Sequence, residues 1–226
     1  MAVKEIRRVT LRTNPQMFDR VIQELQQGLA KELDWLTHSF GRCERLVQMK
    51  DGRKVYTPNL YIGKNEYLRL SPDSGLGNYS FVCMGEPEQV ISPQFEQVNM
   101  KAPFSLIVWV DMRTIGYDDE RNTEDVKAQV LRVCNQLAFI RSGYVHVERV
   151  YNHAENVFQG FSLDEVDNQF LMSPYSGWRF TGELSVRDVC RDALYNYLYV
   201  EPEEVQWIDE SIDYDIYSNT YWKVIV

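Results

Sequence analysis

The stretch FSLIVWVDM, residues 104–112, is a strongly apolar segment and decides the fold class. Segments rich in Val, Ile, Phe and Trp are typical of β-strands. With a period of two, one face would carry Phe104, Leu106, Val108 and Val110, and the other Ile107 and Trp109. A strand that is apolar on both faces is typical of the interior of a sheet with both faces covered. We therefore expect a strand here that is buried on both sides.

A second strand follows later in the chain, in GWRFTGELSV, residues 177–186. Its residues alternate cleanly, which predicts a half-buried strand. One face would carry Trp178, Phe180, Leu184 and Val186, and the other Arg179, Thr181, Glu183 and Ser185. No nucleophile, phosphate loop or metal ligand set lies in it, so its large apolar side chains indicate packing.

Two amphipathic helices are expected around these strands. The first would begin at Asn14 as N-cap, with Pro15 in the first helical position. Its apolar side chains recur every three or four residues: Phe18, Val21, Ile22, Leu25, Leu29 and Leu33. That spacing predicts one apolar stripe along a helix. Gly28 lies within this helix and is interpreted either as a weak point of the helix or as a place where a neighbouring element packs closely against it.

The second helix is expected between Asn122, as N-cap, and Gly143, just beyond its end. Glu124 and Asp125 suit the positive end of the helix dipole. Its apolar stripe would consist of Val126, Val130, Val133, Leu137 and Ile140. The segment YVHVERVY, residues 144–151, then has the period of a strand.

A hairpin is expected between these helices, around the turn dipeptide Asp51-Gly52, because Asp-Gly tolerates positive φ. Two more short strands are expected at 66–70 and 79–84. Together these elements predict an α+β fold: a mixed or antiparallel sheet packed by two amphipathic helices, with a β-hairpin region and a C-terminal extension. The expected domain spans 1–200 with a hairpin insertion around 42–84, and 201–226 forms an acidic aromatic arm.

Charge is distributed unevenly along the chain. The net charge is −9, and residues 201–226 carry −6 of it, with seven acidic residues against Lys223. The same segment is rich in aromatic residues, which makes Trp207, Tyr214, Tyr217 and Trp222 candidate contact residues. An acidic protein does not hold nucleic acid by counterion release, but it can surround DNA without binding it.

Residues suited to chemistry are few. The chain has three histidines, and His146 and Glu148 on one strand offer at most two metal ligands. No dinucleotide, P-loop, serine hydrolase or zinc protease motif occurs. The four cysteines, Cys43, Cys83, Cys134 and Cys190, are widely spaced and are interpreted as free thiols. The sequence therefore predicts no catalytic residues, no cofactor and no metal.

The chain has no apolar run of about 18 residues, which argues against a membrane span. The N-terminal MAVKEIRRVTLRT has basic residues but no apolar core behind them, so it does not read as a secretory signal. We expect a protein that is made in a cytoplasm.

The order of the expected elements resembles that of a known protein family. A capped helix, a hairpin region, the strand PFSLIVWVDM, an amphipathic helix and the final strand GWRFTGELSV follow one another. This order resembles the tail-terminator, or tail-completion, proteins of tailed bacteriophages over residues 10–187. The chain is longer than the compact members of that family, and the segment after 187 lies outside their common pattern.

The resemblance implies a structural virion protein of the phage neck or tail, made in the bacterial host. Such a protein forms a homo-oligomeric ring, docks on other neck, portal or tail proteins, and lets DNA pass as cargo. The candidate contacts would include Asp51 and Gly52 besides the aromatic residues of the arm. Two alternatives stay open: an α+β enzyme or ligand-binding domain with an unrecognised pocket, and an adaptor that uses its acidic aromatic tail.

Overall fold

The computed structural model describes residues 15–63, 65–73, 75–91, 98–116 and 123–188, with the backbone alone for 88–91, 98–99 and 187–188. The chain divides into two compact units, 1–189 and 190–226. The second unit lies outside the described residues, and so do the predicted arm and its four aromatic candidates. The predicted N-caps Asn14 and Asn122 also lie outside them.

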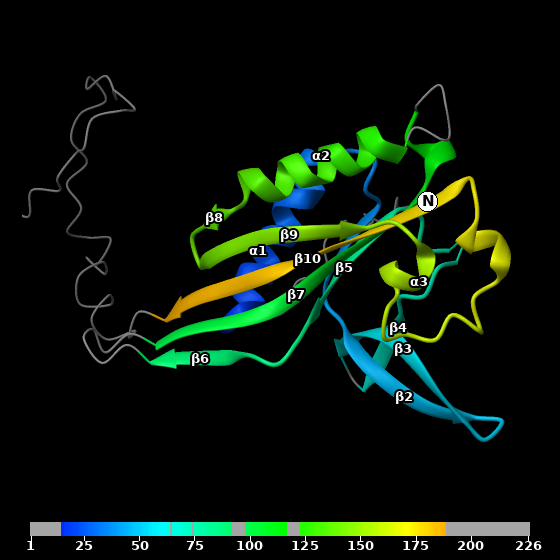
Figure 1. Ribbon diagram of the computed structural model, residues 1–226, viewed down its shortest axis with the longest axis horizontal. Helices are drawn as coiled ribbons and strands as arrows, with labels where there is room; N and C mark the ends of the chain where they lie inside the picture. Colours follow the sequence, from blue (N-terminus) through cyan, green and yellow to red (C-terminus); the bar gives the residue numbers. More distant parts are fainter. Residues whose placement is uncertain (1–14, 64, 74, 92–97, 117–122, 189–226) are drawn as a thin grey trace, which may run out of the picture. The chain divides into compact units, whose positions relative to one another are not determined.

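A large mixed sheet forms the centre of the first unit, with the strand order β1-β5-β7-β10-β9-β8 and with β6 beside β7 (Figure 1). The strands are β1 (His38–Arg42), β5 (Tyr79–Met84), β6 (Glu88–Ile91), β7 (Val98–Asp111), β8 (Phe139–Ile140), β9 (Gly143–Tyr151) and β10 (Tyr175–Asp188). The β1–β5 pair is parallel and the other pairs are antiparallel. The predicted α+β class is confirmed.

A second, three-stranded sheet has the order β2-β3-β4. Its strands are β2 (Glu44–Lys50), β3 (Arg53–Gly63) and β4 (Glu66–Arg69). We call it the small sheet. The helical elements are α1 (Phe18–Glu32), α2 (Thr123–Gln136) and α3 (Ala154–Val157), with short 3-10 turns at Met112–Thr114 and Asn168–Leu171. The predicted strand 79–84 is β5 and pairs with β7 in the large sheet, so the small sheet ends at β4.

Helices α1 and α2 cover one face of the large sheet (Figure 1). The core on this face contains the alternating residues that the sequence predicted for both strands: Phe104, Leu106, Val108 and Val110 of β7, and Trp178, Phe180, Leu184 and Val186 of β10. The stripe of α1 packs against them, together with Val126, Val130 and Val133 of α2. The predicted contact between helices and sheet is confirmed.

The opposite face of the large sheet carries a second, smaller core. Ile107 and Trp109 point to this side, so β7 is buried on both faces as predicted. They are joined by Tyr79 and Phe81 of β5, by Leu60 of the small sheet and by residues around α3. The small sheet is therefore fastened to the large one through apolar packing on this face.

The ends of both helices differ from the prediction. Helix α1 begins at Phe18 with Met17 as N-cap, so Pro15 precedes the helix instead of occupying its first position. The carbonyl oxygen of Pro15 accepts a hydrogen bond from Arg20 Nε at 3.1 Å. The described backbone therefore enters the helix through Met17, whose φ is 49°.

Helix α2 ends at Gln136, earlier than predicted. Ile140, which was assigned to the helix stripe, lies in β8, because Ile140 pairs with Gly143 across a tight hairpin. Gly143 is thus the first residue of β9 and not a helix cap. A Cβ at this position would overlap the carbonyl oxygen of Ser185 in the neighbouring strand, which explains the glycine.

Candidate interaction surface

The tip of the small sheet is the turn that the sequence predicted. Asp51 and Gly52 join β2 to β3, and their φ angles are 49° and 74°. Positive φ at both central residues is the mark of the type I′ hairpin turn that Asp-Gly favours. Both residues are exposed. The turn is confirmed, while their role as contact residues stays a prediction.

The small sheet is held by the segment that follows α3. The backbone N–H of Ser162 donates to Tyr56 O at 2.8 Å, and the backbone N–H of Tyr56 donates to Ser162 Oγ at 3.0 Å. Glu165 accepts from Arg69 at 2.9 Å and pairs with Lys50 at 2.7 Å. Hydrogen bonds from Lys50 first, and then from Arg69, lower the pKa of Glu165. These contacts link both edge strands of the small sheet to one segment.

Exposed apolar side chains gather on the small sheet. Of the seven large hydrophobic residues that are exposed in the described part of the chain, five belong to it: Val47, Met49, Tyr61, Ile62 and Tyr67. Val47 and Met49 share one face of β2, an edge strand, and are 52% and 66% exposed. Tyr61 and Tyr67 pack on each other with ring centroids 5.3 Å apart. The register places Val47 and Met49 near the Asp51-Gly52 turn and Tyr61 with Tyr67 near the other end of β3, so these side chains form two separate groups on the small sheet. Exposed apolar surface of this kind can mark an interaction site.

The same hairpin is basic, although the whole chain is acidic. Residues 44–54 contain Arg45, Lys50, Arg53 and Lys54 against Glu44 and Asp51, a net charge of +2. The guanidinium of Arg45 lies 3.9 Å from the centre of the Tyr56 ring. The small sheet therefore offers apolar side chains within a positively charged surround, which suits an acidic and aromatic partner segment.

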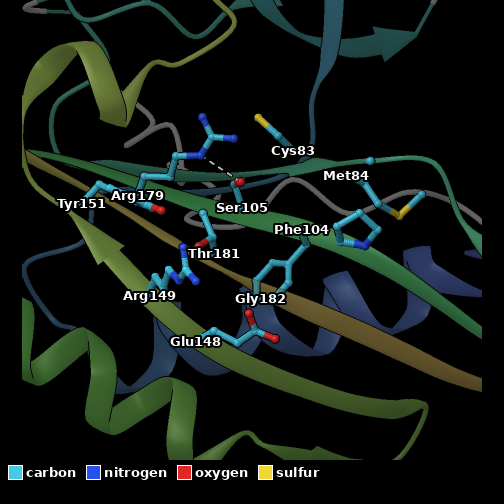
Figure 2. A pocket seen from close by; sticks show the side chains of 12 residues that line it. Cys83, Met84, Phe104, Ser105, Glu148, Arg149, Tyr151, Arg179, Thr181 and Gly182 are labelled. Carbon is cyan, nitrogen blue, oxygen red and sulfur yellow. Dashed lines mark hydrogen bonds between the residues drawn. The ribbon is translucent and has the colours of Figure 1, made fainter.

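A hollow of about 600 Å³ lies on the sheet face that α1 and α2 do not cover (Figure 2). Polar side chains from β7, β9 and β10 line it: Ser105, Glu148, Arg149, Tyr151, Arg179 and Thr181. Arg179 Nε donates to Ser105 Oγ at 2.9 Å, and one terminal nitrogen donates to the carbonyl oxygen of Gln159 at 2.9 Å. A bulge in the β9–β10 pairing lies at Glu148, and both Glu148 and Arg149 border the hollow.

A charged cluster lies on the large sheet, on the polar side of β10. Glu183 Oε1 accepts from Lys101 Nζ at 2.8 Å and from Tyr144 OH at 2.7 Å. The hydrogen bond from Lys101, and next the one from Tyr144, lower the pKa of Glu183. Because the three residues come from β7, β9 and β10, the cluster ties three strands together and is structural.

The histidines do not form a site. His38 stacks on Phe40 with ring centroids 5.3 Å apart, and His146 and His153 are exposed. Across the described ranges, no group of three or more His, Cys, Asp or Glu residues is arranged to hold a metal ion. Nor does the described part contain a helix long and apolar enough to cross a membrane.

No protein-family model matches this sequence, and no curated protein matches it. The function must therefore be argued from the surfaces of the chain itself. Sequence reasoning found the turn of the small sheet but missed its exposed apolar side chains, because Val47, Met49 and Tyr61 look like ordinary strand residues until their burial is known.

Proposed function

We propose that the chain is a structural subunit of a tailed-bacteriophage neck or tail. It assembles into a homo-oligomeric ring, joins or completes the tail, and docks on other neck, portal or tail proteins of the virion. The observation that carries the proposal is that five of the seven exposed large hydrophobic residues in the described part of the chain belong to the small sheet. Exposed apolar side chains fit a subunit whose function is contact. The protein performs no catalysis in this role.

A ring requires two different surfaces on each subunit, which meet head to tail. The small sheet, with Val47 and Met49 on an edge strand, supplies one of them. The acidic aromatic segment 201–226 has the composition that complements it, because its charge of −6 is opposite in sign to the +2 of the hairpin 44–54. Burying one large apolar side chain contributes about 1.5–3 kcal/mol, so a few such anchors suffice for assembly.

The charge of the whole chain suits a conduit for DNA. A net charge of −9 repels a phosphate backbone, so DNA passes as cargo without specific binding. A protein that grips DNA would instead show a basic stripe and a steep salt dependence. The basic residues of the small sheet are few and lie among apolar side chains, which favours a protein partner.

The test is the mass of the full chain in solution, measured by light scattering behind size-exclusion chromatography over a range of concentrations. We expect a closed oligomer whose mass is a whole multiple of the subunit mass, and ring-shaped particles in negative stain. A monomer at every concentration would overturn the homo-oligomeric ring. Genes for portal, capsid or tail proteins beside this one would provide an independent check of the virion assignment.

The hollow in Figure 2 favours a second candidate, a ligand-binding domain. Arg149 and Arg179 at its border would suit an anionic ligand. The two candidates are separated by Arg179→Gln: a ring subunit keeps its oligomeric mass, whereas a binding domain loses affinity for a small anion such as phosphate or citrate, measured by calorimetry.

A further inference from the structure

Two cysteines that are 40 residues apart in the sequence meet at the base of the small sheet. The Sγ atoms of Cys43 and Cys83 lie 3.1 Å apart. After an irregularity between Ser39 and Arg42, the parallel register places Arg42 of β1 opposite Val82 of β5, and Cys43 and Cys83 are the residues that follow them. The backbone N–H of Cys43 donates to Val82 O at 2.8 Å, which fixes this position.

The backbone at this pair suits a disulfide. Neighbouring strands lie about 4.8 Å apart, within the range of about 4.4–6.8 Å that disulfides span between Cα atoms. The two sulfur atoms must approach by about 1 Å to reach the length of an S–S bond. Rotation of the side chains can provide that movement without a change in strand pairing.

The pair is also accessible to a reagent. Cys83 is half-buried and borders the hollow of about 600 Å³, and both thiols border an adjoining one of about 200 Å³. Arg45 and Arg179 line the smaller hollow as well. Guanidinium groups attract carboxylates, so this entrance favours an anionic thiol reagent such as glutathione.

Cys134 provides the contrast within the same chain. It lies on α2 and is buried in the core between the helices and the large sheet, and burial raises the pKa of its thiol to about 12. Cys43 and Cys83 lie on the other side of the large sheet, and the hydrogen bond with Cys83, followed by burial, raises the pKa of Cys43. Cys83 is therefore the thiol that reacts first, since it is the more exposed of the pair.

We propose that Cys43 and Cys83 form a reversible disulfide when the folded protein meets a disulfide oxidant such as oxidised glutathione. The thiolate of Cys83 attacks one sulfur of the oxidant, which gives a mixed disulfide and releases one glutathione. Cys43 then loses its proton and attacks Cys83 Sγ, and the second glutathione leaves. Two protein thiols are oxidised and one glutathione disulfide is reduced to two thiols, so electrons and protons balance.

The disulfide has a defined mechanical effect. Cys43 is the residue between the end of β1 and the start of β2, so the bond fastens the base of the small sheet to β5. It also closes a long loop, which restricts the unfolded chain. The inference rests on the two side chains and their access and holds whether or not the chain is a virion protein.

The test starts from the full chain, reduced and folded, incubated with oxidised glutathione and then freed of it. Free thiols are alkylated in denaturant, and peptides are mapped by mass spectrometry without reduction. We expect the four thiols to fall to two, a peptide that joins Cys43 to Cys83, and full recovery after dithiothreitol. The melting temperature of the oxidised protein should rise by about 5 °C.

Two variants sharpen the result. Cys134→Ala should leave the disulfide unchanged, whereas Cys43→Ser should stop the reaction at a stable glutathione adduct on Cys83. Four free thiols after oxidation of the wild type would overturn the proposal. A bond that maps to Cys134 or Cys190, or one that joins two chains, would overturn it equally, and these readings need no variant to fold.

Discussion

Gly28 of α1 lies directly against the side chain of Leu137, the residue that follows α2. A Cβ at residue 28 would overlap Leu137 Cδ1 and would lie 3.1 Å from Leu137 Cγ. The missing side chain therefore lets the two helices approach. Of the two interpretations that the sequence left open for Gly28, close packing is the one that the structure supports.

This contact predicts opposite effects of one substitution in two backgrounds. Gly28→Ala alone should destabilise the protein by about 1 kcal/mol, because overpacking costs about 1–3 kcal/mol and helix propensity returns about 1 kcal/mol. Together with Leu137→Ala, the same change should stabilise it by about 1 kcal/mol, because the space is then free. Urea unfolding of both single variants and the double variant measures the coupling.

The comparison of the two single variants with the double variant, a double-mutant cycle, contains its own control. Leu137→Ala alone should cost about 2 kcal/mol, the low end for leucine truncations, because this side chain is half-buried. An unchanged unfolding midpoint for Leu137→Ala would show that this side chain does not pack against α1. Strictly additive effects would show that the two residues are not in contact.

The exposed apolar side chains of β2 predict variants that separate assembly from folding. Val47→Ser and Met49→Ser should each weaken association by about 1 kcal/mol, since roughly half of each side chain is free to be buried by a partner. Stability of the separated subunit should change by less than about 0.5 kcal/mol. Concentration-dependent light scattering gives the first quantity and urea unfolding of the dilute protein gives the second.

Phe139 offers a matched control for these variants. It is 89% exposed and lies on β8, at the opposite end of the strand order of the large sheet from β1. Phe139→Ser should leave association unchanged if the small sheet is the specific contact. Equal losses at both places would indicate general stickiness, and no loss at Val47 and Met49 would exclude the small sheet.

The parts that the sequence predicted well are those with a strict local period. Alternation along 104–110 correctly predicted that Leu106 faces one core and Ile107 the other, because successive side chains of a strand point to opposite faces of the sheet. The end of α2 was mispredicted because Leu137 and Ile140 continue the helical spacing by coincidence. Pairing between Ile140 and Gly143, which ends the helix, depends on a neighbouring strand that periodicity does not reveal.

The candidate surfaces were harder to predict for the same reason. Cys43 and Cys83 meet only because β1 and β5 are parallel neighbours, and their spacing in the sequence carries no trace of that pairing. Val47 and Met49 follow the ordinary pattern of a strand. They become candidate contact residues only because no other described element covers their side chains. Local composition identifies a strand, whereas its exposure depends on the whole fold.

The cluster around Glu183 predicts a dependence of stability on pH. Lys101 and then Tyr144 hold the pKa of Glu183 below its ordinary value of 4.5. The stabilisation is therefore complete above that ordinary value and is lost as the pH falls through the lower pKa of the folded state. Glu183→Gln should remove this part of the acid sensitivity, so the wild type should lose its advantage over the variant on acidification.

The measurement is urea unfolding of both proteins from about pH 6 to about pH 3, across the range in which carboxylates titrate. The difference between wild type and Glu183→Gln should shrink with falling pH and should be smaller in high salt, because Lys101 is partly exposed. Glu165 and Asp111 also have lowered pKa values and serve as the common background in both proteins. A difference that stays constant with pH would contradict the assignment.

The acidic aromatic segment 201–226 gives the last prediction. The described residues already form a sheet with a core on each face, so deleting 201–226 should leave this unit folded. Assembly should weaken, because the segment combines aromatic anchors with a charge of −6, and the hairpin 44–54 of the small sheet combines apolar side chains with a charge of +2. Trp207→Ala, Tyr214→Ala and Trp222→Ala should reduce affinity more than Asp209→Asn or Glu210→Gln, because charges at a rim act mainly on the association rate. Association kinetics at two salt concentrations distinguish the two classes of variant.

A truncated chain that unfolds would show that the segment belongs to the core, and one that assembles at full affinity would show that the contact lies elsewhere.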